Sequence, residues 1–208
     1  MIDELLKFFV LFFVVVEPVT LVPVFASLTN GASAAYRRKM SLKAVAVSGI
    51  VLALFALGGA WFIRMMGISV DAFRIAGGVM LFLIALEMVF ARESGTKTTS
   101  EEKAEVTQRA DISVFPLAFP FIAGPGALAT VLLTFGTAGD DILLKLGLLG
   151  VIAAVLLITL ILLLTAPFVN RAIGVTGAHV VSRLAGVVLA ALAVQFMIDG
   201  LRGAFAVG

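Results

Sequence analysis

Cysteine is absent from this chain, and histidine and tryptophan occur once each. The first absence excludes disulfide bonds and thiolate catalysis, although it leaves the redox environment of the protein open. The sequence also supplies neither a cluster of metal ligands nor a Ser/His/Asp set. We therefore expect no metal site and no cofactor, and an enzyme is the least favoured of the functional classes considered.

Charged residues are also scarce, because Asp, Glu, Lys and Arg make up 13% of the chain. Hydrophobic residues make up 62%, and the mean hydropathy is +1.18. Too few polar groups remain to cover the surface of a soluble domain. The net charge of +2 gives no reason to expect a nucleic-acid partner. The composition predicts a protein whose main partner is the lipid bilayer.

Six apolar intervals are long enough to provide the ~20 residues that cross a bilayer. Three contain no charge, and they cover residues 44–63, 112–139 and 146–170. Three contain internal charges, and they cover residues 5–29, 70–90 and 180–205. An open sheet cannot satisfy its backbone in lipid, so we expect an all-α integral membrane protein with six transmembrane helices.

The first apolar interval could also be a secretory signal peptide, since "ASA" at residues 32–34 resembles a cleavage site. Signal peptides begin with a basic region, whereas this chain begins with Asp3 and Glu4 against Lys7. Glu17 also interrupts the apolar segment. We expect the segment to be retained as the first span.

Lysine and arginine are distributed unequally between the two sides of the predicted topology. One side has ten, Arg37, Arg38, Lys39, Lys43, Arg92, Lys97, Lys103, Arg109, Arg171 and Arg183, and the other has five, Lys7, Arg64, Arg74, Lys145 and Arg202. The richer side is expected to be cytoplasmic. Both termini would then lie outside the cytoplasm, and the polar segment 92–111 would be a flexible cytoplasmic linker.

The two halves of the chain resemble one another in three places. "EPVTLVPVF" matches "GPGALATVL", "MMGIS" matches "AIGVT", and "FRIAGGVMLFLIALEM" matches "SRLAGVVLAALAVQFM". The matches keep the same order and a nearly constant offset. Because three helices are an odd number, the second copy would enter from the opposite face. We predict two inverted repeats, 1–91 and 112–208, with chance similarity between apolar helices as the alternative.

Proline and glycine interrupt the first and fourth predicted helices at equivalent positions. In an inverted repeat, such broken helices release backbone groups near the middle of the membrane, where they can bind a substrate. The predicted substrate-binding residues are Glu17, Pro18, Thr20, Pro23, Gly124, Pro125, Gly126 and Thr130. The alternative is that the prolines only kink packed helices.

Charged side chains within the predicted spans are costly and need a partner or a function. We consider four for coupling or for intramembrane ion pairs, Glu17, Arg74, Glu87 and Arg183. The two arginines could neutralise Glu17 or Asp199, hold a substrate carboxylate or extend to the interface. Asp199 and Arg202 are expected to form an ion pair at a helix end.

The motif "FRIAGGVMLF", the motif "PLAFPFIAGPGALAT" and an acidic residue followed by Pro and a second Pro are similar to sequences of the MarC family. These are six-span inner-membrane proteins related to archaeal neutral amino acid transporters. The resemblance covers nearly the whole chain and implies a secondary transporter of small neutral amino acids such as glycine, alanine and serine. It also implies coupling to a cation gradient.

The functional prediction is therefore alternating-access transport in the inner membrane, with a small-molecule substrate. Glu17 could accept the driving proton, while carbonyls near Pro18 and Pro23 could instead hold sodium. A channel or exporter of small solutes is the first alternative, and an intramembrane enzyme is the second. The sequence leaves the oligomeric state open.

Overall fold

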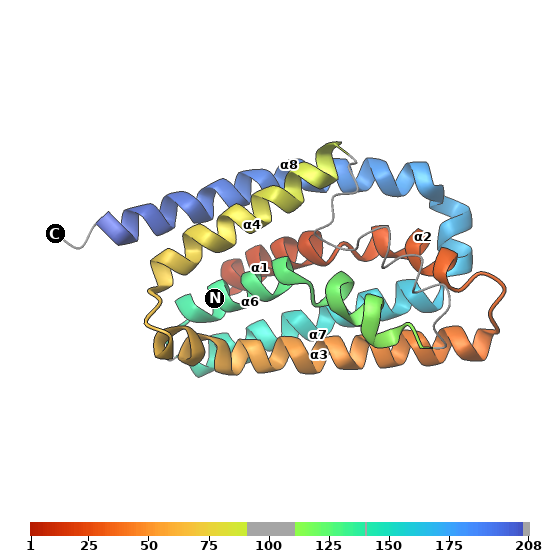
Figure 1. Cartoon of the computed structure of the whole chain (residues 1–208), viewed down its shortest axis with the longest axis horizontal. Helices are drawn as coiled ribbons and strands as arrows, with labels where there is room; N and C mark the ends of the chain where they lie inside the picture. Colours follow the sequence, from red (N-terminus) through yellow and green to blue (C-terminus); the bar gives the residue numbers. More distant parts are fainter. Residues whose placement is uncertain (91–110, 140, 206–208) are drawn as a thin grey trace.

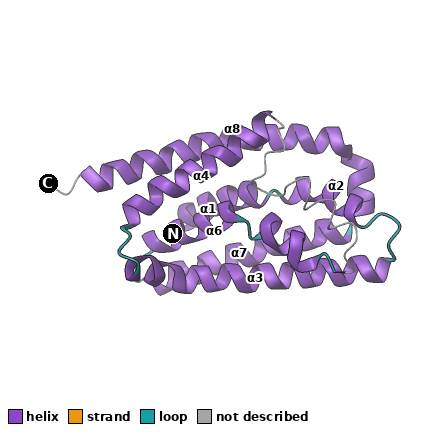
Figure 2. Ribbon diagram, viewed as in Figure 1, coloured by secondary structure: helices purple, strands orange, loops and turns teal. Residues whose placement is uncertain are grey.

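The computed structural model describes residues 1–90, 111–139 and 141–205 (Figure 1). Every regular element in these ranges is a helix (Figure 2). The elements are α1 (Ile2–Val16), α2 (Pro18–Leu28), α3 (Ala34–Met65), α4 (Val70–Phe90), η1 (Ser113–Ile122), α6 (Pro125–Thr137), α7 (Ile142–Leu164) and α8 (Ala166–Phe205). Apart from Asp111, the predicted linker 92–111 lies outside the described residues.

Five helical stretches are long and apolar enough to cross a membrane, at residues 2–28, 34–59, 70–90, 142–164 and 176–205. The pair η1 and α6 is bent by 54° and adds a sixth if it forms one span. No membrane-length element in the described ranges is a strand. The prediction of an all-helical, multi-pass membrane protein is confirmed, with five or six spans.

The boundaries of two predicted spans were wrong. The fifth was expected to reach residue 170, but α7 ends at Leu164 and α8 begins at Ala166. Pro167 has no N–H group and is tolerated only in the first turn of a helix, so it starts a new helix and does not extend the old one. The second span was expected from residue 44, whereas α3 begins at Ala34 because Ser33 Oγ accepts a hydrogen bond from the Tyr36 N–H (3.2 Å).

The largest contacts between helices join the two halves of the chain. In Figure 1, α4 and α8 lie side by side along one edge of the molecule, and this pair shares the most extensive contact of all. Helix α3 packs against η1, α6 and α7, while α7 packs also against α1 and α2. Helix α8 packs against α2 as α4 packs against α6. Each half is therefore built around elements of the other half.

Glycines on both helices allow α4 and α8 to approach closely. A Cβ atom on Gly78 would lie 2.7 Å from Met197 Cγ, and a Cβ on Gly186 would lie 2.8 Å from Met88 Cβ. The same two positions would lie 2.8 Å and 3.1 Å from the carbonyl oxygens of the opposite helix. Small residues let helix backbones meet in this way within a membrane. The crossing is thus reciprocal, with a glycine of each helix against a methionine of the other.

The ends of the elements group at two ends of the bundle. The start of α1 and the end of α8 point toward one end, together with the turn between α3 and α4 (Figure 1). The turn between α2 and α3 lies at the other end (Figure 1).

Candidate functional site

The first interruption of a membrane helix lies at Glu17. Helix α1 ends at Val16 and α2 begins at Pro18, with Glu17 between them at φ 53° and ψ 52°. This left-handed conformation is uncommon for any residue other than glycine. Pro18 fits the first position of α2, where its missing N–H would have no helical partner in any case. The helix therefore stops for one residue and restarts.

The side chain of Glu17 connects this interruption to α8. It is buried, and its Oε1 accepts a hydrogen bond from Ser182 Oγ at 3.0 Å. Ser182 is buried as well. A buried carboxyl group requires such partners, because burial removes it from water. The bond joins residues 165 positions apart, so it fixes the first interruption against the last helix.

The second interruption is preceded by an irregular segment, η1. Phe115 and Phe119 within it have extended backbones, with φ and ψ of −125° and 126° and of −129° and 129°. Each precedes a proline, and a proline moves the residue before it away from the helical region. The Ala123 N–H donates to the Ala118 carbonyl five residues earlier, at 2.8 Å. Because of these Phe-Pro pairs, η1 does not form a regular α-helix.

The chain then turns at Gly124 into α6. Gly124 has an extended backbone and precedes Pro125, the first residue of the helix. A Cβ atom on Gly124 would collide with the carbonyl oxygen of Pro120. This position consequently accepts only glycine without a movement of the backbone.

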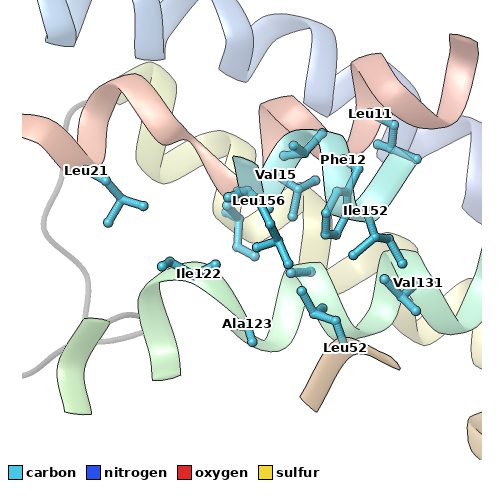
Figure 3. Packing of buried hydrophobic residues seen from close by; sticks show 14 of the residues in the cluster. Leu11, Phe12, Val15, Leu21, Leu52, Ile122, Ala123, Val131, Ile152 and Leu156 are labelled. Carbon is cyan, nitrogen blue, oxygen red and sulfur yellow. The ribbon is translucent and has the colours of Figure 1, made fainter. Parts of the chain in front are cut away.

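A cavity of about 240 Å³ adjoins the second interruption. Its lining is almost entirely apolar and comes from four elements and the turn between η1 and α6, with Val15, Met80, Leu83, Ile84, Pro120, Phe121, Gly124, Pro125, Gly126 and Ala127. A Cβ atom on Gly126 would lie 2.6 Å from Ile84 Cδ1 and 3.3 Å from Val15 Cγ1. Figure 3 shows Val15, Ile122 and Ala123 among the buried side chains around this turn.

Thr130 lies one turn beyond Gly126 on α6, and it is completely buried. Its Oγ1 atom has no hydrogen-bond partner among the described residues. Other buried hydroxyl groups, such as those of Ser48 and Thr159, donate to backbone carbonyls at 2.9 Å and 2.8 Å. A buried polar atom without a partner costs free energy, so it requires an explanation.

The structure brings only some of the predicted binding residues together. Gly124, Pro125 and Gly126 line the cavity, whereas Glu17 does not. Thr20 and Pro23 are half-buried on α2, and neither lines the cavity. The two interruptions therefore present two different environments, a carboxyl group bonded to α8 and an apolar cavity beside α4.

The remaining predicted charges have other surroundings. Arg74 pairs with Asp71 at 3.1 Å within α4, and not with Glu17 or Asp199. Asp199 accepts a hydrogen bond from Gln195 Nε2 at 2.8 Å, so the expected pair with Arg202 is replaced by a contact one helical turn earlier.

Two further predicted residues differ in burial, since Arg183 is exposed and Glu87 is half-buried. Ser182 was missed by the sequence analysis. Its partner is remote in sequence, and nothing in the pattern around it distinguishes it from other membrane serines.

An ion pair fixes the start of η1 to α3. Lys43 Nζ lies 2.5 Å from Asp111 Oδ2, and Asp111 Oδ1 also accepts hydrogen bonds from the hydroxyl and the N–H of Ser113. The hydrogen bond from Lys43, with those from Ser113, holds the pKa of Asp111 well below its usual range. The second half is thereby attached to the first directly before its irregular segment.

The fold and its apolar surface define a multi-pass integral membrane protein. Residues 2–205 match the family described as "MarC family integral membrane protein". The chain is 37% identical to the UPF0056 membrane protein YhcE of Escherichia coli K12, covering 96% of this chain and 92% of that protein. It is also 37% identical to the UPF0056 membrane protein YvbG of Bacillus subtilis 168, covering 96% and 94% of the two chains.

A UPF0056 membrane protein of Archaeoglobus fulgidus is 31% identical over 93% of this chain and 90% of its own length. No solved structure matches the chain. The chain belongs to the MarC family, as the sequence motifs predicted.

Proposed function

We propose that this protein is a secondary transporter of small neutral amino acids, of the glycine, alanine and serine class, that works by alternating access. The observation that carries the proposal is the cavity of about 240 Å³ at the second helix interruption. Binding sites of membrane transporters occur where broken helices expose backbone groups inside the protein. The cavity adjoins such a place, and it has room for a small solute.

The lining of the cavity is suited to a substrate that carries a carboxylate and an uncharged side chain. The N–H groups of Gly126 and Ala127 belong to the first turn of α6, where N–H groups have no partner within the helix. The N-terminus of a helix also favours a negative charge. The apolar side chains around it would suit a hydrogen or methyl side chain and would disfavour a charged side chain. Thr130 supplies a nearby hydroxyl group.

Inverted repeats, 1–91 and 112–208, would provide the two states of such a transporter. Several local features support them at offsets of 107 or 108 residues. Prolines begin both α2 and α6, at 18 and 125, and left-handed glycines occur at 67 and 174, with φ of 72° and 64°, and at 31 and 139, with φ of 74° and 55°. Ser33 and Asp141 cap the following helices with their side chains. Chance similarity would not be expected to extend to these turns and caps.

Glu17 is the proposed coupling group in this scheme. A buried carboxyl group can exchange a proton when its surroundings change, and Glu17 lies at the contact between α2 and α8. Sodium held by backbone carbonyls is the alternative. Glu87 and Arg183 are the further candidates for coupling or for intramembrane ion pairs, while Arg74 pairs with Asp71. We assign no catalytic activity and no cofactor.

The proposed location is the inner membrane. The Lys and Arg asymmetry supports an orientation with both termini outside the cytoplasm. Single cysteines at Gly95 and Gly208 of this cysteine-free chain can be labelled in intact cells with an impermeant thiol reagent. Labelling at Gly208 but not at Gly95 is expected, and the opposite result would reverse the orientation.

Uptake of radiolabelled alanine into proteoliposomes tests the transport function. We expect a pH gradient to drive accumulation, and unlabelled alanine on the opposite side to accelerate exchange. A sodium gradient acting in place of the proton gradient would change the coupling ion. Flux without acceleration by unlabelled substrate would identify a channel, and an absence of alanine, glycine and serine flux would contradict the proposed substrate class.

A further inference from the structure

Helices α4 and α8 are joined more closely to each other than to the helices that precede them. The reciprocal crossing places Gly78 against Met197 and Gly186 against Met88. By contrast, the contacts of α4 with α3 and of α8 with α7 are among the smallest between elements. We define the α4–α8 pair as residues 70–90 and 175–205, and the core as α1, α2, α3, η1, α6 and α7.

Among the described residues, the connection that leads into α4 and the one that leads into the second part of α8 each pass through a left-handed glycine. Gly67 precedes α4 with φ 72°, and Gly174 interrupts α8 with φ 64° and ψ 175°. A Cβ atom on either glycine would have no atom within 4 Å. Packing therefore does not explain these glycines, whereas a change of chain direction does. Residues of this kind absorb the dihedral changes when one part of a protein rotates against another.

The boundary between the α4–α8 pair and the core passes through the cavity. Met80, Leu83 and Ile84 of α4 form one wall, and the other lining residues belong to the core. The hydrogen bond from Ser182 to Glu17 crosses the same boundary. Any rotation of the pair at its two glycines must consequently change the cavity and this hydrogen bond together.

We propose that the α4–α8 pair moves as one unit at Gly67 and Gly174 and forms the movable wall of the cavity. Ser182 is then a positioning residue, which holds the unit against the core through Glu17. That the movement controls substrate access rests on the proposed transport function. The movement itself does not, so it can be measured without any substrate.

Spin labels in the cysteine-free chain measure the movement directly. Exposed positions are available on each part, with Leu54 on α3, Leu157 on α7, Val79 on α4 and Val187 on α8. Pulsed electron paramagnetic resonance of the protein in nanodiscs should give one narrow distance for the 54/157 pair and one for the 79/187 pair. The 54/187 pair should give two distances. A single narrow distance for 54/187, or a broad distribution for 79/187, would overturn the proposal.

Ser182→Ala tests the positioning role. Loss of one hydrogen bond to a carboxyl group should change the ratio of the two 54/187 populations by roughly tenfold. Ser48→Ala is the matched control, because Ser48 is also buried and bonds to the Ala44 carbonyl of its own helix at 2.9 Å. An unchanged ratio in Ser182→Ala, or an equal change in both variants, would remove Ser182 from the mechanism.

A disulfide tests whether the movement is needed for transport. A Cβ on Gly77 of α4 would lie 3.7 Å from Ala129 Cβ of α6, within the range of disulfides. Oxidised Gly77→Cys/Ala129→Cys should lose alanine uptake and regain it on reduction, and its 54/187 distances measured with thiol-independent labels should collapse to one. The cysteine-free wild type treated with the same oxidant should retain uptake.

These readouts separate two failures. If oxidation reduces the two 54/187 distances to one, but the reduced protein takes up no alanine, the proposed substrate is contradicted. The movement is established all the same. Retained uptake in oxidised Gly77→Cys/Ala129→Cys would show that transport does not require the movement.

Discussion

The two helix interruptions differ in the residue before the proline, Glu17 in the first and Gly124 in the second. Glu17 adopts a left-handed conformation and extends its side chain to α8. Gly124 has an extended backbone, and the carbonyl of Pro120 occupies the place where a side chain would begin.

The comparison shows that a helix restarted by a proline can serve two purposes. A proline restarts the helix in each case, so the residue before it has no helical role to fulfil. At the first interruption the residue before the proline is Glu17, so a carboxyl group lies inside a membrane span. At the second that residue is Gly124, so backbone comes close to other helices and a cavity remains. The two interruptions therefore share a proline at the start of the following helix but differ in backbone conformation and in chemistry.

The largest expected effect is at the second interruption. Gly124→Ala should lower the free energy of unfolding by about 3 kcal/mol, because backbone and not a flexible side chain blocks the new Cβ. Denaturation in detergent measures this change. Gly150→Ala is the control, since a Cβ there would have open space. Equal stability of the two variants would show that the second interruption tolerates a side chain as the first does.

Glu17→Gly gives the first interruption the same residue as the second. Relief of the left-handed strain and loss of the hydrogen bond are each worth about 1 kcal/mol, so the free energy of unfolding should change little. Alanine uptake driven by a pH gradient should nevertheless fall at least tenfold. Glu17→Gln, which keeps a hydrogen-bond acceptor, should lose the same gradient dependence. Full gradient-driven uptake in either variant would exclude Glu17 as the coupling group.

Thr130→Val tests the polar group near the second interruption. Removing a buried hydroxyl group without a partner should raise the free energy of unfolding by about 1 kcal/mol and weaken alanine binding. Thr159→Val should instead be destabilising, since the Thr159 hydroxyl donates to the Val155 carbonyl at 2.8 Å. Unchanged alanine affinity in Thr130→Val would show that this hydroxyl group does not contribute to the site.

The smallest effect is expected where η1 begins. The depressed pKa of Asp111 means that its ion pair stabilises the fold above the unfolded pKa of about 4, and that this stabilisation is lost as the pH falls through the lower folded value. Both side chains are partly exposed, so Lys43→Met should cost less than about 1 kcal/mol at pH 7. Unfolding at pH 7 and pH 3 measures the difference, which should shrink at the lower pH.

Much of this architecture could be predicted because the bilayer imposes simple rules. Runs of about 20 apolar residues gave the spans, and Pro18 and Pro125 marked where helices restart. The irregular course of η1 was missed, since the effect of Phe-Pro pairs at 115 and 119 depends on local backbone geometry. The contact between Glu17 and Ser182 was also missed, because periodicity shows which face is apolar and not which remote helix covers it.

The interlocking of the two halves has a consequence for the synthesis of this protein in the cell. Helix α3 packs mainly against η1, α6 and α7, and α4 packs mainly against α8. All four of these partner elements are translated later than α3 and α4. The first three spans, residues 2–28, 34–59 and 70–90, must therefore remain in the membrane with their glycine and glutamate surfaces uncovered until the rest of the chain has been synthesised. A nascent chain stopped at this stage would present an unfinished surface to insertion chaperones and membrane proteases.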